Sequence, residues 1–234
     1  MTKKELLEIV SSHKMWLEDT SMGERATLSH AELSYLDLAN VDLRQANLNF
    51  ANLYNTNLDG ALLDGASMRH ATLFETSLKS ASMRGVNMGN AKLQKVVLEK
   101  ADLSNTNLSY SCICNTDLSF SSLRNVDLSQ ATLDKVDFYR ACLDNVNFHR
   151  VVLFKTNFLG ASLTEKIVQI GPVGRLGCYI TYFIDRDRVV QETHRDESMT
   201  LCKFERFIKD DVEFYGRDWI TIIDLFKSLR DGRE

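Results

Sequence analysis

A period of five residues runs through the middle of this chain. From Ala26 the sequence divides without a gap into units of five (ATLSH, AELSY, LDLAN, VDLRQ), and the last unit, ASLTE, ends at Glu165. These 28 units cover 140 of the 234 residues. The third residue of every unit is apolar, most often leucine, and the first is Ala, Val, Thr or Ser in every unit except the one that begins at Leu36.

Five matches neither the helical period of 3.6 nor the strand period of 2, so neither an amphipathic helix nor a flat sheet would bury every third residue. A coil that turns one corner per unit would do so. Four units would make a square coil of 20 residues, with the third and first residues facing the axis and equivalent residues stacked in ladders. With only 1 proline and 11 glycines, the corners would fall to Asn and Asp before the central leucine and to the polar residues after it, which bond local backbone and tolerate unusual dihedrals.

These units resemble the A-(D/N)-L-x-x pattern of the pentapeptide-repeat family. The resemblance implies an all-β solenoid, a right-handed quadrilateral β-helix of about seven coils, roughly 34 Å long at the strand spacing of about 4.8 Å per coil. A solenoid also needs its end coils covered. We therefore expect an N-terminal helical cap over residues 1–25, the β-helix over 26–165 and a C-terminal α+β module over 166–234.

Both flanking segments fit this expectation. Thr2 and Glu5 have capping-box spacing, and an apolar set follows them at helical spacing, which predicts a helix of about 15 residues that covers the first coil. This set is Leu6, Leu7, Ile9, Val10, Trp16 and Leu17. After Glu165 the composition predicts strands over 166–174 and 177–193 with a hairpin turn at 186–188, then helices near 200–209 and 217–230.

No catalytic, cofactor or metal constellation is present in the sequence, so the chain is predicted to be non-enzymatic and to need no cofactor. The histidines lack metal-ligand spacing, and no phosphate-binding glycine loop occurs. His30 and His70 would be about 10 Å apart, two coils from each other, which is too far to share a metal. Cys112 and Cys114 flank the inward Ile113 and would bring two thiols close together outside the coil, but ordinary reduced thiols are favoured over metal or redox use.

Aromatic residues at equivalent unit positions suggest a partner-binding surface. Tyr54 and Phe74 would stack in adjacent coils and point outward, with Tyr35 beside the first coil, while Phe120 and Tyr139 form a smaller set on the next face. Exposed aromatic patches mark sites for partner proteins. The alternative is that the terminal segments fold back over these rings.

The inward third position forms the predicted core ladder. Its representatives are Leu48, Met68, Met88, Leu108, Leu128, Phe138, Phe148 and Phe158. The three phenylalanines indicate a wider core in the last coils. In the gyrase-modulating proteins of the family the corresponding end forms a dimer, but here the C-terminal segment intervenes, and a homodimer has no support in the sequence.

The best-known proteins of the family are quinolone-resistance and gyrase-modulating proteins, which mimic duplex DNA with an acidic rod. This chain has a net charge of −4, spread evenly, and Arg44, Arg84 and Arg124 recur on one face that should be acidic in a mimic. Binding of another protein is therefore preferred. The alternatives are a DNA-mimicking modulator of gyrase or another nucleic-acid enzyme, and an activity in the C-terminal module.

Several properties bear on where the protein works. The charge pattern predicts no direct nucleic-acid binding, and the sequence has no apolar run of about 18 residues and no N-terminal signal, so we expect a cytoplasmic protein without membrane contact. The five cysteines fit reduced thiols. The segment His13-x-x-Trp16-Leu17 followed by Gly23 resembles the leader of some bacterial and phage members of the family.

Overall fold

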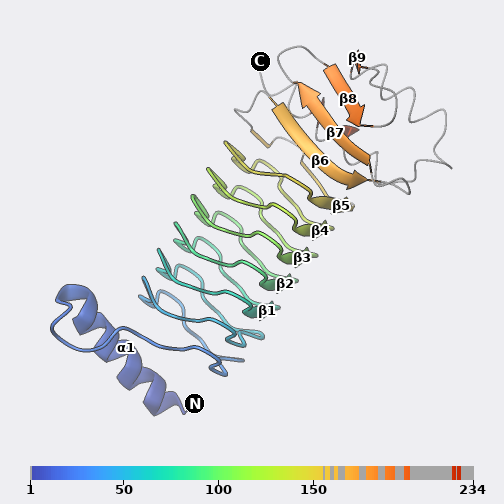
Figure 1. Cartoon of the computed structure of the whole chain (residues 1–234). Helices are drawn as coiled ribbons and strands as arrows, with labels where there is room; N and C mark the ends of the chain where they lie inside the picture. Colours follow the sequence, from blue (N-terminus) through green and yellow to red (C-terminus); the bar gives the residue numbers. More distant parts are fainter. Residues whose placement is uncertain are drawn as a thin grey trace.

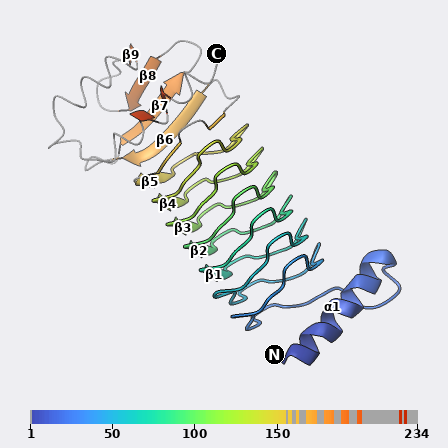
Figure 2. The same cartoon turned by 180° about the vertical axis from the view of Figure 1, so that it is seen from behind.

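The computed structural model shows a stack of coils with one helix at its first end and a four-stranded sheet at its other end (Figures 1 and 2). The helix, α1, spans Lys3–Glu18. The structure describes residues 2–154, 156–158, 161–162, 167–173, 178–183, 188–192, 198–200, 223–224 and 226–227.

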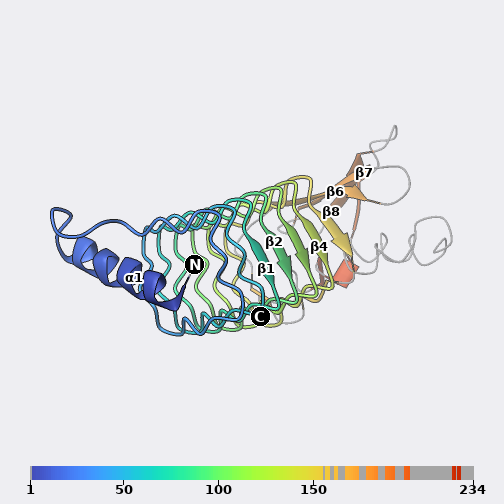
Figure 3. The same cartoon turned by 90° about the horizontal axis from the view of Figure 1, so that it is seen from below.

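Parallel pairing at intervals of 20 residues builds the stack. The regular strands lie on one face of the coils (Figure 3) and form one sheet in chain order: β1 Thr72–Phe74, β2 Lys92–Gln94, β3 Cys112–Cys114, β4 Thr132–Asp134 and β5 Val152–Phe154. On the other faces single bridges keep the same interval, from Thr27 with Asn47 to Cys142 with Ser162. The prediction of a 20-residue coil is therefore confirmed.

Backbone hydrogen bonds between neighbouring coils hold this register. The N–H of Leu28 donates to the carbonyl of Asn47 at 2.7 Å, and the N–H of Asn47 donates back to Ala26 at 3.0 Å. The same pair of bonds recurs along the stack, so the polar backbone is satisfied by the adjacent coil. The side chains then determine only which residues of each unit face the interior and which face the solvent.

The first and third residues of the units fill the interior. Every residue of the ladder Leu48, Met68, Met88, Leu108, Leu128, Phe138, Phe148 and Phe158 is at most 3% exposed. Phe138 and Phe158 stack with ring centroids 5.1 Å apart. Where threonine takes the small first position, its hydroxyl bonds the preceding coil, as Thr76 Oγ1 does by donating to the Leu53 carbonyl at 2.6 Å.

The corners differ in one respect from the sequence prediction. Second-position Asn and Asp do bond local backbone, since Asn57 Oδ1 accepts from the N–H of Asp59 at 3.0 Å. The unusual dihedral, however, lies at the fifth residue: every fifth residue from His30 to Arg150 has φ between 50° and 68°. Tyrosine, phenylalanine, lysine and arginine adopt it as well as Asn and Gly, because the inter-coil ladder fixes the backbone there.

Helix α1 lies across the first end of the stack. The predicted capping box is present: Glu5 N–H donates to Thr2 Oγ1, and Thr2 N–H donates to Glu5 Oε2 at 2.7 Å. Leu6 is buried, but Leu7 is 60% exposed, so its assignment to the covering apolar set is wrong. One apolar face is enough for a helix that touches the coils on one side only.

The turn from α1 into the first coil is tight. Gly23 has φ of 76°, and a Cβ there would collide with the Ser12 carbonyl oxygen. Ser12 Oγ accepts from the N–H of Glu24 at 2.8 Å, and His13 Nδ1 accepts from the N–H of Ala26 at 3.1 Å. His13 is fully buried and stacks on Trp16. Two helix side chains therefore fix the point where the repeats begin.

Four strands pair beyond the coils in the antiparallel order β6-β7-β8-β9. They are β6 Ile167–Val173, β7 Cys178–Phe183, β8 Arg188–Glu192 and β9 Ser198–Thr200. Strands β6, β7 and β8 fall within the predicted strand segments, although β8 already begins at Arg188, the last residue of the predicted turn. Strand β9 was not predicted, and it ends at Thr200, where the sequence predicted a helix to begin. The rest of that helix lies outside the described residues. Residues 223–224 and 226–227, within the second predicted helix, are helical.

Candidate functional site

Three of the predicted aromatic residues form a row along one face of the first coils. Tyr35 meets Tyr54 edge to face with centroids 5.0 Å apart, and Tyr54 stacks on Phe74 at 5.2 Å. Tyr35 is 68% exposed, while Tyr54 and Phe74 are half-buried by each other. The sequence placed these rings together because they share a face and are one coil apart.

A second row was missed by the sequence analysis. Phe50 lies flat between His30 and His70, with ring centroids 4.8 Å apart on both sides and interplanar angles of 2° and 6°. Phe50 is 50% exposed and both histidines are exposed. The sequence does indicate this row, because all three are fifth residues of their units and lie 20 residues apart. The two histidines were considered only as metal ligands, and Phe50 between them was overlooked.

The two rows border one face of the rod, at units 31–35, 51–55 and 71–75, and together we call them the aromatic surface. It consists of His30, Phe50, His70, Tyr35, Tyr54 and Phe74. Among the described residues, α1 and β6–β9 lie at the two ends of the stack and not over this face (Figures 1 and 2). The edge is charged, because Lys95 Nζ lies 5.4 Å from the Phe74 centroid and 2.8 Å from Glu75 Oε1.

The other predicted aromatic pair is separate and smaller. Phe120 and Tyr139 meet edge to face at 5.5 Å, and Phe120 is 45% exposed. Two cations flank them, with Lys100 Nζ 6.0 Å from the Phe120 centroid and the Arg140 guanidinium 5.2 Å from the Tyr139 centroid. Since these cations cover ring faces, the pair offers less free apolar area than the aromatic surface.

On the face that carries Arg44, Arg84 and Arg124, each arginine is paired with a carboxylate. Their partners are Asp42 at 2.7 Å, Asp102 at 2.5 Å and Asp144 at 3.4 Å. The hydrogen bond from Arg44 lowers the pKa of Asp42 below its ordinary value. Charges of both signs therefore alternate along this face.

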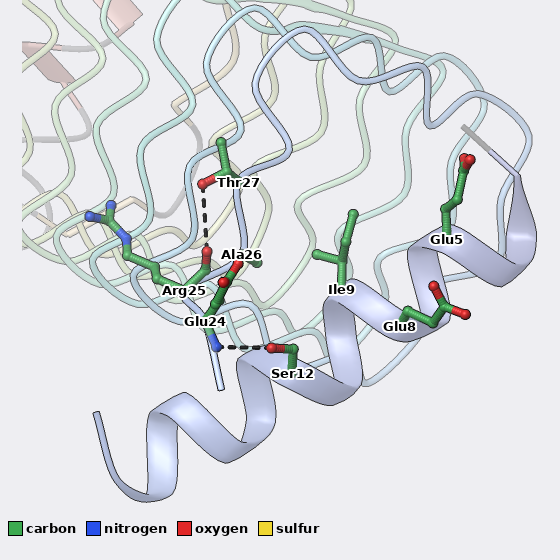
Figure 4. Close-up of a pocket in the computed structure, with 8 residues that line it drawn as sticks. All are labelled: Glu5, Glu8, Ile9, Ser12, Glu24, Arg25, Ala26 and Thr27. Atoms are coloured by element: carbon green, nitrogen blue, oxygen red, sulfur yellow. Dashed lines mark hydrogen bonds between the residues drawn. The ribbon is translucent and has the colours of Figure 1, made fainter. Parts of the chain in front are cut away.

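A pocket of about 380 Å³ lies between α1 and the first coil (Figure 4). Its lining is mostly acidic and polar: Glu5, Glu8, Ile9, Ser12, Glu24, Arg25, Ala26 and Thr27. Glu5 is held by the capping box, and hydrogen bonds from Thr2 lower the pKa of its carboxyl group. Ser12 is held by the N–H of Glu24, so these lining groups serve the junction between helix and coil.

The two predicted thiols are close. Cys112 Sγ and Cys114 Sγ are 3.4 Å apart on β3, with Cys112 exposed. Burial, and next the neighbouring Cys112 thiol, raise the pKa of Cys114 to about 11. Within the described residues no three His, Cys, Asp or Glu side chains are grouped to hold a metal ion. No helix in that part of the chain is both long and apolar enough to cross a bilayer.

Comparison with protein-family models identifies the repeats. The model for pentapeptide repeats matches residues 24–60, 51–90, 81–119 and 115–150, with 8 copies. Comparison with curated proteins gives no match.

Among solved structures, Rfr23 from the cyanobacterium Cyanothece 51142 is 24% identical, with 53% of this chain and 99% of that chain covered and a TM-score of 0.47. QnrB1, a plasmid-mediated fluoroquinolone resistance protein, is 16% identical, with 61% and 86% covered and a TM-score of 0.37. HetL from Nostoc sp. strain PCC 7120, a protein involved in heterocyst differentiation regulation, is 18% identical, with 69% and 96% covered and a TM-score of 0.23.

The family match and the coil geometry agree. Pentapeptide-repeat proteins fold as right-handed β-helices, and the matched segment is the one in which strands pair in parallel every 20 residues. Since the matched residues make up more than half of the sequence, this chain belongs to the pentapeptide-repeat family.

Proposed function

We propose that this chain is a non-enzymatic, protein-binding rod that recognises its partner through the aromatic surface. In this proposal residues 26–165 form about seven coils, α1 caps the first coil, and the segment 166–234 closes the other end. The rod works in the cytoplasm and presents its side chains on a rigid backbone. It needs no cofactor for this role.

The observation that carries the proposal is the gathering of six rings in two rows that border one face, four of the rings exposed and two half-buried. Tyr35 is 68% and Phe50 50% exposed, although each already contacts a neighbouring ring. Rings that are ordered before binding lose little conformational entropy when a partner covers them, and aromatic residues dominate the binding energy of protein interfaces. A partner that buries this face would therefore gain affinity at low entropic cost.

DNA mimicry is the weaker alternative because of the charge arrangement. A mimic of duplex DNA must present carboxylates as regularly spaced, unpaired negative charges. Here Asp42, Asp102 and Asp144 are each neutralised by an arginine on the same face. Excess protein that inhibits or protects DNA gyrase in a supercoiling assay would favour mimicry over the present proposal.

The test replaces two rings of the surface and compares partners. Tyr54→Ala combined with Phe74→Ala should leave the thermal unfolding temperature nearly unchanged and remove the proteins that crosslink to a photoreactive residue placed at position 50. Tyr110→Ala is the matched control, because Tyr110 is 55% exposed and lies outside the aromatic surface. The experiment uses extracts of the source organism with and without nuclease treatment.

Two outcomes would overturn the proposal. One is that the double variant unfolds, which would make the rings part of the fold. The other is that the crosslinked proteins are the same for the double variant and for Tyr110→Ala. Nuclease-sensitive crosslinks would instead indicate a nucleic-acid-dependent partner.

A further inference from the structure

Two thiols lie side by side on the outer face of β3, two coils beyond the aromatic surface. Cys112 and Cys114 stand on either side of the buried Ile113, and their Sγ atoms are 3.4 Å apart. Strand β3 is paired with β2 on one side and β4 on the other. The backbone that carries both thiols is therefore fixed from both sides.

This backbone geometry disfavours a disulfide between the two residues. Equivalent atoms of residues two apart in an extended strand are about 6.6 Å from each other, Cβ atoms included. A disulfide needs its Cβ atoms about 3.8 Å apart. Closing that difference would pull β3 out of register with both neighbouring strands.

An ion placed between the sulfurs fits the spacing much better. With metal–sulfur bonds of about 2.3 Å, two thiolates on a tetrahedral ion are about 3.8 Å apart, and two on a linear ion about 4.6 Å. The observed 3.4 Å is close to the bent arrangement and far from the linear one. Small rotations of the two side chains would suffice, and thiolates select soft and borderline cations.

The neighbouring residue on β4 also points to a cation. Asp134 is in register with Cys114, and its Oδ1 is buried without a hydrogen-bond partner among the described residues. A buried carboxylate oxygen with no partner costs free energy, which a nearby positive charge offsets.

We propose that Cys112 and Cys114 bind one soft divalent cation of the zinc group, in a bent two-thiolate arrangement beside the Asp134 carboxylate. Each thiol releases its proton to solvent as its sulfur bonds the cation. The described residues offer no preformed set of three ligands, so water completes the coordination. This site is independent of the proposed partner-binding function.

Cadmium is the probe that tests the site, because thiolate binding gives it a charge-transfer absorbance in the ultraviolet. The reduced full chain should show saturable binding of one Cd²⁺ per chain, with Zn²⁺ as competitor. Cys112→Ser or Cys114→Ser should weaken binding roughly 100-fold through loss of a thiolate ligand, and Asp134→Asn by about tenfold. The control is Cys142→Ser, which removes a cysteine from another face and should leave binding unchanged.

A second measurement needs no variant of the pair. In the unaltered protein, Cd²⁺ should slow alkylation of Cys112 and Cys114 and leave the rate at Cys142 unchanged. The proposal is overturned if the double variant Cys112→Ser with Cys114→Ser binds Cd²⁺ as the wild type does. It is equally overturned if the two cysteines are alkylated at the same rate with and without Cd²⁺, or if oxidised glutathione joins them in an intramolecular disulfide.

Discussion

The interior and the outer surface of the rod follow different rules, although every unit supplies both. Inside, one coil resembles the next. Third residues such as Leu93 and Met88 are at most 1% exposed and occupy nearly equivalent environments in their coils. Outside, rings gather on one face of the first coils, paired charges on another and thiols at β3. The repeat therefore specifies the fold, and departures from the repeat carry whatever is specific to this protein.

The largest expected effect comes from breaking the interior. Leu93→Ala should lower the free energy of unfolding by about 2–5 kcal/mol, because a rod fixed by backbone ladders cannot collapse onto the cavity. Gln94→Ala changes the next residue, which points outward, and should cost no more than about 0.5 kcal/mol. Urea unfolding followed by circular dichroism measures both. Equal losses would contradict the division between interior and surface.

Acid should weaken the first end of the rod. Burial lowers the pKa of His13, as do the nearby charges of Arg25 and Arg44, while the Arg44 carbonyl and Asp42 act in the opposite direction. The unfolded chain then binds the proton first, so the stability that His13 contributes is complete above about pH 6.5 and is lost as the pH falls from there toward the lowered value.

The unfolding temperature, measured from pH 7.5 to 5, tests this effect. The wild type should lose more stability over that range than His13→Gln, which has no titrating ring. His30→Gln is the control, because His30 lies exposed on the aromatic surface. Parallel curves for wild type and His13→Gln would show that His13 does not sense pH.

Much of this division could be predicted from the sequence, because inward positions recur every five residues. The contact of Tyr54 with Phe74 followed from the same register. The exposure of Leu7 could not be predicted in this way. The spacing of apolar residues identifies the apolar face of a helix but not the angle at which the helix lies on a coil. The left-handed fifth residue was also missed, because its occupants include Phe50 and Lys135, which prefer other dihedrals in isolation.

A smaller effect is expected where the interior contains a polar group. Thr76 is fully buried, and its hydroxyl donates to the Leu53 carbonyl in the preceding coil at 2.6 Å. Thr76→Val keeps the shape and removes the bond, so the free energy of unfolding should fall by about 1 kcal/mol. Thr72→Val, on the exposed outer position of β1, should change it little. A stabilised Thr76→Val variant would mean that the hydroxyl only adds a desolvation cost.

The smallest effect should have the opposite sign and lie at a corner. Lys135 has φ of 54° and an exposed side chain. A left-handed conformation costs a residue with a Cβ roughly 1–2 kcal/mol, while glycine in its place would lose about 0.5–1 kcal/mol more conformational entropy on folding. Lys135→Gly should therefore stabilise the rod by about 0.5 kcal/mol. Lys92→Gly, at an exposed strand position in β2, adds the same conformational entropy cost but relieves no left-handed backbone, so it should destabilise the rod. If both variants change the free energy of unfolding in the same direction, the corners are not strained.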